Sequence, residues 1–317
     1  MTSAPADDPA SLAEPLRLRV AAHAANRFLL AMVRVVTPGL GLMDAVLLLA
    51  ILQANLAPIT ANRDLQLRFA TLDALPDDEL RRPISVTALA ASLRLPFETV
   101  RRRLAQLARS GICEATERGY RVPTRVMAQP RFASGHAVIY RELFTLQARL
   151  ASVGCLPPSG PVAASIHPEP PVRIASRLAV DYFLRALTML SDRTGDPVNG
   201  FLLAAIFNGN ATGFETAARS APIGAAEGLL PDADLRPVPA AEAARQLSVP
   251  HETVRRRLRG LEQRGLCART RGGWTIPQAS LGRLQFETAL EENMGHLRQM
   301  FSNLARLGVL HGPASAA

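Results

Sequence analysis

At 317 residues, the chain is about twice the length of a typical domain, so we expect two domains. Only 5% of the residues are aromatic, and the apolar residues are mostly alanine, leucine and valine, a composition that favours helices over a β-sandwich. The formal net charge is +9 and all 36 basic residues are arginines, so we expect a mainly α protein whose partner carries phosphates or an acidic surface.

Residue types that bind metals or carry out catalysis show no recognised spacing. The three cysteines and six histidines form no CxxC or Cys/His pattern, and the chain has no phosphate-binding glycine loop, HExxH or GxSxG motif. We therefore expect no enzyme activity, no metal and no cofactor. No signal peptide opens the chain, and charged residues, a proline and glycines interrupt its most apolar stretch, residues 28–52, which favours a soluble protein of the cytoplasm.

The N-terminal part of the chain predicts two apolar helices. We expect residues 1–16 to be flexible, followed by a helix from about residue 19 to 36 that ends at Thr37-Pro38-Gly39. A second helix is predicted from about residue 42 to Asn55. For this asparagine, a capping or buried hydrogen bond is the favoured role, and ligand binding is the alternative.

A helix-turn-helix pattern follows. The spacing of apolar residues predicts a short helix over 85–93, and Pro96 lies at the start of the next helix, where its missing N–H costs least. At about 100° per residue, apolar positions form one face of this second helix, at Val100, Leu104 and Leu107. The opposite face carries Glu98, Arg102, Gln106 and Arg109, and the flanks carry Arg101 and Arg103.

A small β-ribbon and a long helix complete the pattern. Residues 112–122 predict two short strands around a glycine-containing turn, and a long helix is predicted over 134–153. Tyr120 is expected to pack the ribbon against the core. Cys113, at the entry to the ribbon, is expected to be a small core residue, with a thiol sensor as the alternative.

The whole pattern occurs twice. Residues 96–104 recur as residues 250–258, 154 positions later, and the same offset continues through the ribbon, where Trp274 replaces Tyr120 and Cys267 matches Cys113. Upstream the offset is 155, so that Asn55 matches Asn210 and the Leu-Pro-Asp of residues 75–77 matches that of residues 230–232. One single-residue gap therefore aligns the two copies.

The repeat predicts the division of the chain. The first unit covers residues 17–154 and the second 173–311, with a proline-rich linker at 155–172 and a flexible end at 312–317. The outward face of the second helix-turn-helix carries Glu252, Arg256, Gly260 and Gln263. The third outward position is Gln106 in the first copy and Gly260 in the second. The two helices could therefore contact different DNA half-sites.

The run from Leu89 to Leu104, with Gly111 and a wing glycine behind it, resembles the DNA-binding motif of bacterial GntR-type regulators. The placement of long helices before and after the motif is more similar to MarR regulators. The resemblance implies two winged helix-turn-helix domains, each a set of helices with a small β-wing, that form a single-chain pseudodimer. Its interface would be made by the helices predicted at 19–36, 134–153, 174–190 and 284–307.

Both the pattern and the resemblance point to DNA as the partner, with arginines at base edges and phosphates. In GntR-type regulators the arginine after Thr-Val, here Arg101 and Arg255, often contacts DNA. The alternative for Arg102 and Arg256 is a surface ion pair with the glutamate four residues earlier. Together the residues expected to contact DNA are Thr99, Arg101, Arg102, Arg103, Gln106, Arg118, Arg121, Thr253, Arg255, Arg256, Arg257, Arg269 and Arg271.

The expected function is therefore that of a transcription regulator that binds double-stranded DNA sequence-specifically through two recognition helices and two wings. Two alternatives stay open, a replication-initiator-like DNA-binding protein and a winged-helix scaffold that binds protein partners. The similarity to MarR regulators implies a pocket between the long helices and the winged helices for a small-molecule effector, whose identity the sequence does not indicate. Further self-association is also open.

Overall fold

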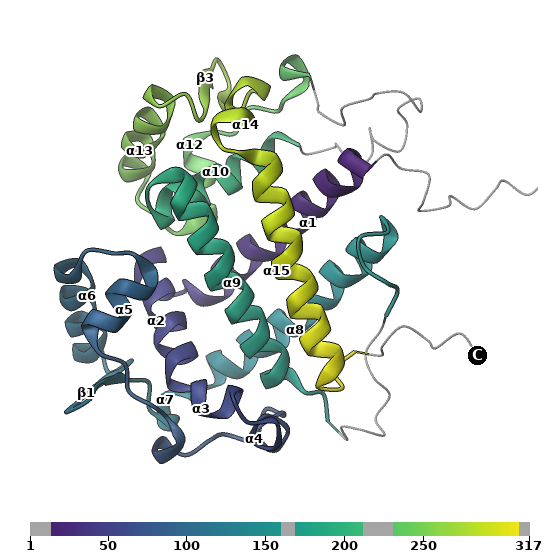
Figure 1. The fold of residues 1–317 in the computed structure, drawn as a ribbon. Helices are drawn as coiled ribbons and strands as arrows, with labels where there is room; N and C mark the ends of the chain where they lie inside the picture. The colour runs from purple at the N-terminus through teal and green to yellow at the C-terminus, as the bar shows by residue number, and fades with distance from the viewer. Residues whose placement is uncertain (1–13, 160–168, 212–230, 311–317) are drawn as a thin grey trace, which may run out of the picture.

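Helices account for most of the described chain, which comprises residues 14–159, 169–211 and 231–310 of the computed structural model (Figure 1). Two antiparallel two-stranded sheets complete it. The predicted mainly α fold is thus confirmed. The predicted flexible segments at residues 1–13 and 312–317, and most of the predicted linker, at 160–168, lie outside the described residues.

The first unit begins with two apolar helices, α1 (Glu14–Val36) and α2 (Leu42–Asn55). Residues 14–16, predicted to be flexible, belong to α1, where Leu16 packs against Val20 and Val153. The contact of half-buried Leu16 explains why the helix begins earlier than predicted, because tertiary packing stabilises a terminal turn that helix propensity alone does not. The predicted bounds of α2 are confirmed.

Between α2 and the next predicted helix, the chain forms short elements that periodicity did not indicate. They are α3 (Ala57–Thr60), α4 (Arg63–Arg68) and the 3-10 helix η2 (Asp78–Leu80). The predicted pair then follows as α5 (Val86–Leu93) and α6 (Phe97–Arg109). Ser85 caps α5 by accepting the Ala88 N–H, and Arg94, in the left-handed region at φ 51°, forms the turn between the helices.

The predicted ribbon consists of β1 (Glu114–Thr116) and β2 (Gly119–Arg121), with Thr116 opposite Gly119. A bridge between Ile84 and Tyr120 joins it to the segment before α5. Gly119 has φ 126°, and a Cβ there would lie 2.3 Å from the Ile84 carbonyl oxygen. Only glycine therefore fits this turn. The unit ends with α7 (Thr124–Met127) and α8 (Pro130–Ser152).

The described part of the second unit repeats this order apart from α3 and α4, whose repeat positions lie outside the described residues. It consists of α9 (Val172–Thr194), α10 (Pro197–Asn210), η3 (Asp232–Asp234), α12 (Ala240–Leu247), α13 (His251–Gln263), β3 (Ala268–Thr270), β4 (Gly273–Thr275), α14 (Gln278–Arg283) and α15 (Phe286–Arg306). The turn between α12 and α13 is formed by Ser248, again in the left-handed region, and Val238 bridges to Trp274 as Ile84 does to Tyr120.

One detail of the predicted repeat alignment is wrong. Asp78, not Asp77, is the counterpart of Asp232, since each accepts the N–H of the first residue of the following short helix, at Thr124 and Gln278. The single-residue gap therefore falls between Asn55 and Asp78. Sequence identity of one Leu-Pro-Asp tripeptide favoured the other alignment, whereas the hydrogen bond depends on distance from the ribbon.

The two units are interlocked through their long helices. As expected, α1, α8, α9 and α15 pack together, and in addition α1 contacts α10 and α12 of the second unit while α9 contacts α2 of the first. Aromatic rings pack across these contacts: the ring centroids of Phe28 and Tyr182 are 6.1 Å apart, and those of the stacked His23 and Phe207 are 4.3 Å apart. Almost all buried apolar residues consequently belong to one continuous cluster that spans both units.

None of the described helices is long and apolar enough to cross a membrane.

Candidate nucleic-acid interface

Helices α6 and α13 lie on the same side of the molecule, at the left in Figure 1, with α9 and α15 nearer the centre of the view. Each is anchored by three buried residues at equivalent positions, as predicted from the helical period. In α6 these are Val100, Leu104 and Leu107, and in α13 Val254, Leu258 and Leu261. The anchoring leaves the opposite face of each helix exposed to solvent.

A buried asparagine ties each ribbon to the helix layer. The side chain of Asn55, at the end of α2, donates to the carbonyl oxygens of Arg82 (2.8 Å) and Tyr120 (3.3 Å) and accepts the Val122 N–H (2.9 Å). Asn210 makes the same three bonds with Arg236, Trp274 and Ile276. The predicted buried hydrogen bond is confirmed at both positions, and it fixes each ribbon relative to the end of α2 or α10.

The first arginine of each triplet forms an ion pair along its own helix. The Arg101 guanidinium donates to Glu98 at 2.8 Å, and Arg255 donates to Glu252 at 3.0 Å. The hydrogen bond to Glu98 raises the pKa of Arg101 above its usual value. The two glutamates were the alternative partners of Arg102 and Arg256, four residues later, but they pair with Arg101 and Arg255, three residues later. Both spacings place side chains next to one another on a helix. Both pairs are exposed and open to exchange for another anion.

The third arginine of each triplet is held at the start of the second helix of its unit, α2 or α10. Arg103 donates to Asp44 in the first turn of α2 at 2.8 Å, and Arg257 pairs with Asp196, the N-cap of α10. Arg257 also donates to Asn199 at 3.0 Å. Arg103 and Arg257 were expected at the DNA, but they lie on the flank that faces α2 and α10 and tie α6 and α13 to those helices. We therefore exclude them from the interface.

The second arginine of each triplet points away from the protein. Arg102 and Arg256 are exposed, and neither forms an ion pair or hydrogen bond with the described part of the chain. On α6, Arg102 lines a groove of about 450 Å³ together with Thr99, Arg101 and Arg109. Thr99 and Thr253 are half-buried, and Gln106 is exposed, whereas Gly260 at the equivalent position of α13 presents no side chain.

The ribbons present some of the expected arginines and not others. Arg118, Arg269 and Arg271 are exposed at the two ribbon turns. Arg121 instead donates to Glu114 at 2.6 Å and to the Asp78 carbonyl oxygen at 3.2 Å. Arg121 is therefore a further correction, because its cross-strand neighbour Glu114 and the Asp78 carbonyl oxygen hold its guanidinium against the protein.

One exposed side chain at this surface was missed by the sequence analysis. Phe97, the first residue of α6, is 45% exposed and is the large hydrophobic residue that stands out as exposed in the described chain. His251 takes its place on α13 and is also exposed. An apolar residue at the start of an otherwise arginine-rich outward face was the available signal.

The turn before α6 and the turn before α13 each contact the other unit. Arg94, in the turn before α6, pairs with Asp192 near the end of α9. The Ser248 hydroxyl, in the turn before α13, donates to the Thr37 hydroxyl oxygen just after α1 at 3.2 Å, since Thr37 itself donates to the Val33 carbonyl oxygen. Contacts from both units therefore help to orient α6 and α13.

The cysteines at the ribbon entries belong to the core. Cys113 and Cys267 are buried, and burial raises the pKa of their thiols to about 11 and about 12. Thiols with a raised pKa are poor nucleophiles, so the predicted packing role is favoured over the sensor alternative. Within the described residues, no group of three or more His, Cys, Asp or Glu side chains is placed to hold a metal ion.

Comparisons of the chain with protein-family models, with curated proteins and with solved structures find no match.

Proposed function

We propose that the protein is a transcription regulator that binds double-stranded DNA sequence-specifically through two winged helix-turn-helix units joined in one chain as a pseudodimer. Helices α6 and α13 act as recognition helices in successive major grooves, and the β1–β2 and β3–β4 ribbons act as wings. As a regulator of bacterial type, it would act in the cytoplasm.

The observation that carries the proposal is the division of labour within the arginine triplets. In both copies the third arginine is held by an aspartate at the start of α2 or α10, the first is paired on the surface, and Arg102 and Arg256 are left exposed without a partner in the described chain. An unpaired guanidinium on the outward face of a helix matches a bidentate contact to guanine. Its recurrence in two copies argues against a solvated face alone.

The flanking residues supply the remaining contacts. Arg101 and Arg255 exchange their glutamates for DNA phosphates, and Arg118, Arg269 and Arg271 enter the minor groove at the wings. Gln106 suits adenine, and Gly260 provides no counterpart to it. We therefore expect the preferred site to consist of two unequal half-sites about one helical turn apart.

The test is fluorescence anisotropy with labelled duplexes selected from a random pool, across a salt series. We compare the wild type with Arg102→Ala/Arg256→Ala and with a control of equal charge, Arg141→Ala/Arg298→Ala, on the long helices α8 and α15. A bidentate base contact contributes about 1–3 kcal/mol, so the first variant should lose about 30-fold or more in affinity for the selected site. The control should lose little.

Two results would overturn the proposal. One is an absence of binding by the wild type at low salt, where phosphate contacts are strongest. The other is an equal loss in both double variants, which would show that net charge rather than the two recognition helices carries the affinity.

A further inference from the structure

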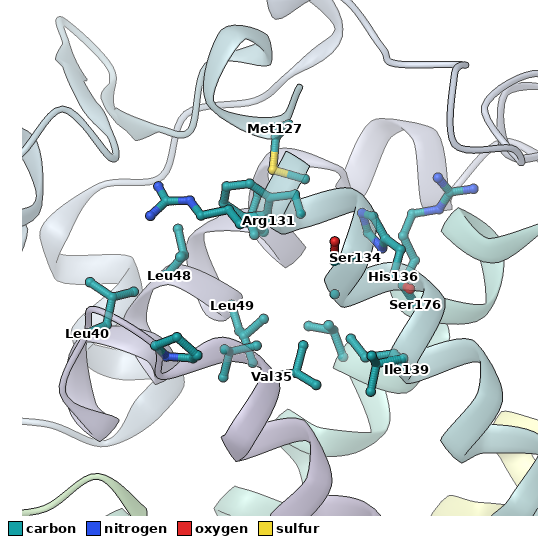
Figure 2. Close-up of a pocket in the computed structure, with 18 of the residues that line it drawn as sticks. Val35, Leu40, Leu48, Leu49, Met127, Arg131, Ser134, His136, Ile139 and Ser176 are labelled. Carbon is teal, nitrogen blue, oxygen red and sulfur yellow. The ribbon is translucent and has the colours of Figure 1, made fainter. Parts of the chain in front are cut away.

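The first unit contains a pocket of about 440 Å³ that the DNA-binding surface does not use (Figure 2). It lies between the end of α1, the helices α2 and α8, and α9 of the second unit. Aliphatic side chains form most of its wall, among them Val35, Leu48, Leu49, Leu52 and Ile139. A cavity of this size holds a molecule of roughly drug size.

The repeat provides an internal comparison, because the equivalent residues of the second unit enclose only about 80 Å³. One difference is at Leu52, whose counterpart is the larger Phe207. The Phe207 ring stacks on His23, with 4.3 Å between ring centroids, and lies tilted against Phe286, with 5.3 Å between centroids, so it occupies space that Leu52 leaves open. The open pocket is therefore not an unavoidable consequence of the fold, since the same arrangement of helices is closed in the other copy.

One end of the open pocket is polar. His136 and Ser176 lie together at this end in Figure 2, and the Nδ1 atom of His136 and the hydroxyl of Ser176 are buried without a hydrogen-bond partner in the described chain. The Nε2 atom of His136 lies 3.4 Å from the Arg173 guanidinium, which can only donate. Because Nε2 then accepts, the proton of the neutral imidazole is on Nδ1, and this unpaired N–H is a donor.

The same end carries positive charge without a paired anion. The Arg177 guanidinium donates to the carbonyl oxygens of Phe69 (2.9 Å) and Gln66 (3.1 Å), and Arg173 donates to Leu72. Across the described residues, neither arginine forms an ion pair, and burial lowers the pKa of each to about 10. A buried cation whose partners are all neutral favours a nearby anion.

These polar groups are confined to the open pocket. The repeat counterparts of His136, Ser176 and Arg177 are Leu290, Ala21 and Ala22, all of them apolar. The open pocket thus carries donors at three positions whose repeat counterparts are apolar, whereas the polar residues of the smaller pocket, among them Asn26, Arg193 and Asn293, lie at other positions. A space left by chance would not require three coordinated polar substitutions.

We propose that this pocket binds an apolar, ring-containing or aliphatic molecule with one anionic head group, and that each chain binds one such molecule. The hydrocarbon part contacts the leucines and valines of α1 and α2. The head group accepts from the His136 Nδ1–H and the Ser176 hydroxyl and neutralises Arg177. The site does not depend on the DNA-binding proposal, since it faces the helix core and not the recognition surface.

The test uses two fluorescent probes with the same rings. Anilinonaphthalene sulfonate carries an anionic head, and phenylnaphthylamine lacks it; both become bright in an apolar site. Titration of the full chain should give one sulfonate probe per chain, bound about tenfold or more tightly than the neutral probe.

Two variants introduce the residues found at the repeat counterparts of these positions, so each new side chain already occurs in the same place of the fold. Leu52→Phe should abolish binding of both probes, whereas Leu65→Phe, on α4 outside the pocket, should leave it unchanged. His136→Leu/Ser176→Ala should weaken the sulfonate about tenfold or more and change the neutral probe less than twofold. Thermal unfolding followed by circular dichroism verifies that each variant is folded.

The proposal fails if the wild type binds no sulfonate probe, or if Leu52→Phe leaves binding intact. Equal affinity of the wild type for the two probes would refute the anionic head group.

Discussion

Replacing Asn55 by alanine tests whether the ribbons are held by single buried side chains. The substitution removes the partners of the Arg82 carbonyl oxygen and the Val122 N–H, and one of the two partners of the Tyr120 carbonyl oxygen, which keeps the Ile84 N–H. Each buried polar group left without a partner costs about 1–3 kcal/mol, and a residue fully buried at this position leaves a space that water fills poorly. We expect a loss of about 3–5 kcal/mol from a total stability of about 5–15 kcal/mol.

The assay is urea unfolding followed by circular dichroism and by the fluorescence of Trp274, the only tryptophan of the chain. Trp274 is buried in β4 of the second unit, far along the chain from Asn55. Because the buried residues form one cluster, the Trp274 midpoint should shift as much as the circular dichroism midpoint. Hydrogen exchange at the Val122 N–H should accelerate as well.

A loss below about 1 kcal/mol, with Val122 still protected, would refute the assigned role of Asn55. A Trp274 transition that stays in place while the circular dichroism transition moves would refute the shared core. Asn210→Ala is the matched variant, and it should lose stability by a similar amount, since its three hydrogen bonds are equivalent.

Three further changes have outcomes that the structure fixes. Gly119→Ala places a Cβ 2.3 Å from the Ile84 carbonyl oxygen and should cost more in urea unfolding than Gly111→Ala, which meets no atom within 4 Å; equal costs would contradict the close contact. Burial lowers the pKa of His23 in the folded state from 6.5 to about 4. The stability that neutral His23 contributes should therefore be complete above pH 6.5 and be lost, by about 3 kcal/mol, as the pH falls to about 4. His23→Leu, which introduces the residue found at the repeat counterpart Leu178, should make stability depend less on pH over this range. Iodoacetamide should alkylate half-buried Cys155 well before Cys113 and Cys267 in the native protein, and mass spectrometry of timed samples would reveal any other order.

The sequence predicted the elements whose signals are local. The bounds of α2 follow from the Gly41 start and the Asn55 end, and the ribbon strands follow from the glycine turns. The long helices were predicted with ends a few residues off, because terminal turns depend on contacts such as that of Leu16 with Val153. The short helices α3 and α4 were missed because six residues or fewer carry no readable period.

The roles of individual arginines could be predicted only in part. Helical geometry correctly placed Arg102 outward, since a buried face fixes its opposite face. The partner of Arg103 is Asp44, which is 59 residues away in the chain, so no local pattern indicates it. The similarity to MarR regulators implied a pocket beside the long helices, but not that one copy is open and the other nearly closed, because the effect of Leu52 against Phe207 depends on the helices packed around it.

The fusion of two copies in one chain has a consequence for evolution. In a homodimer every mutation is present twice, so a change that improves one half-site contact or one pocket is imposed on the other. Here Leu52 and Phe207, or Gln106 and Gly260, are separate codons at equivalent places. Each half can therefore change independently at these positions, while the contacts among helices α1, α8, α9 and α15 keep the two halves under common selection for packing.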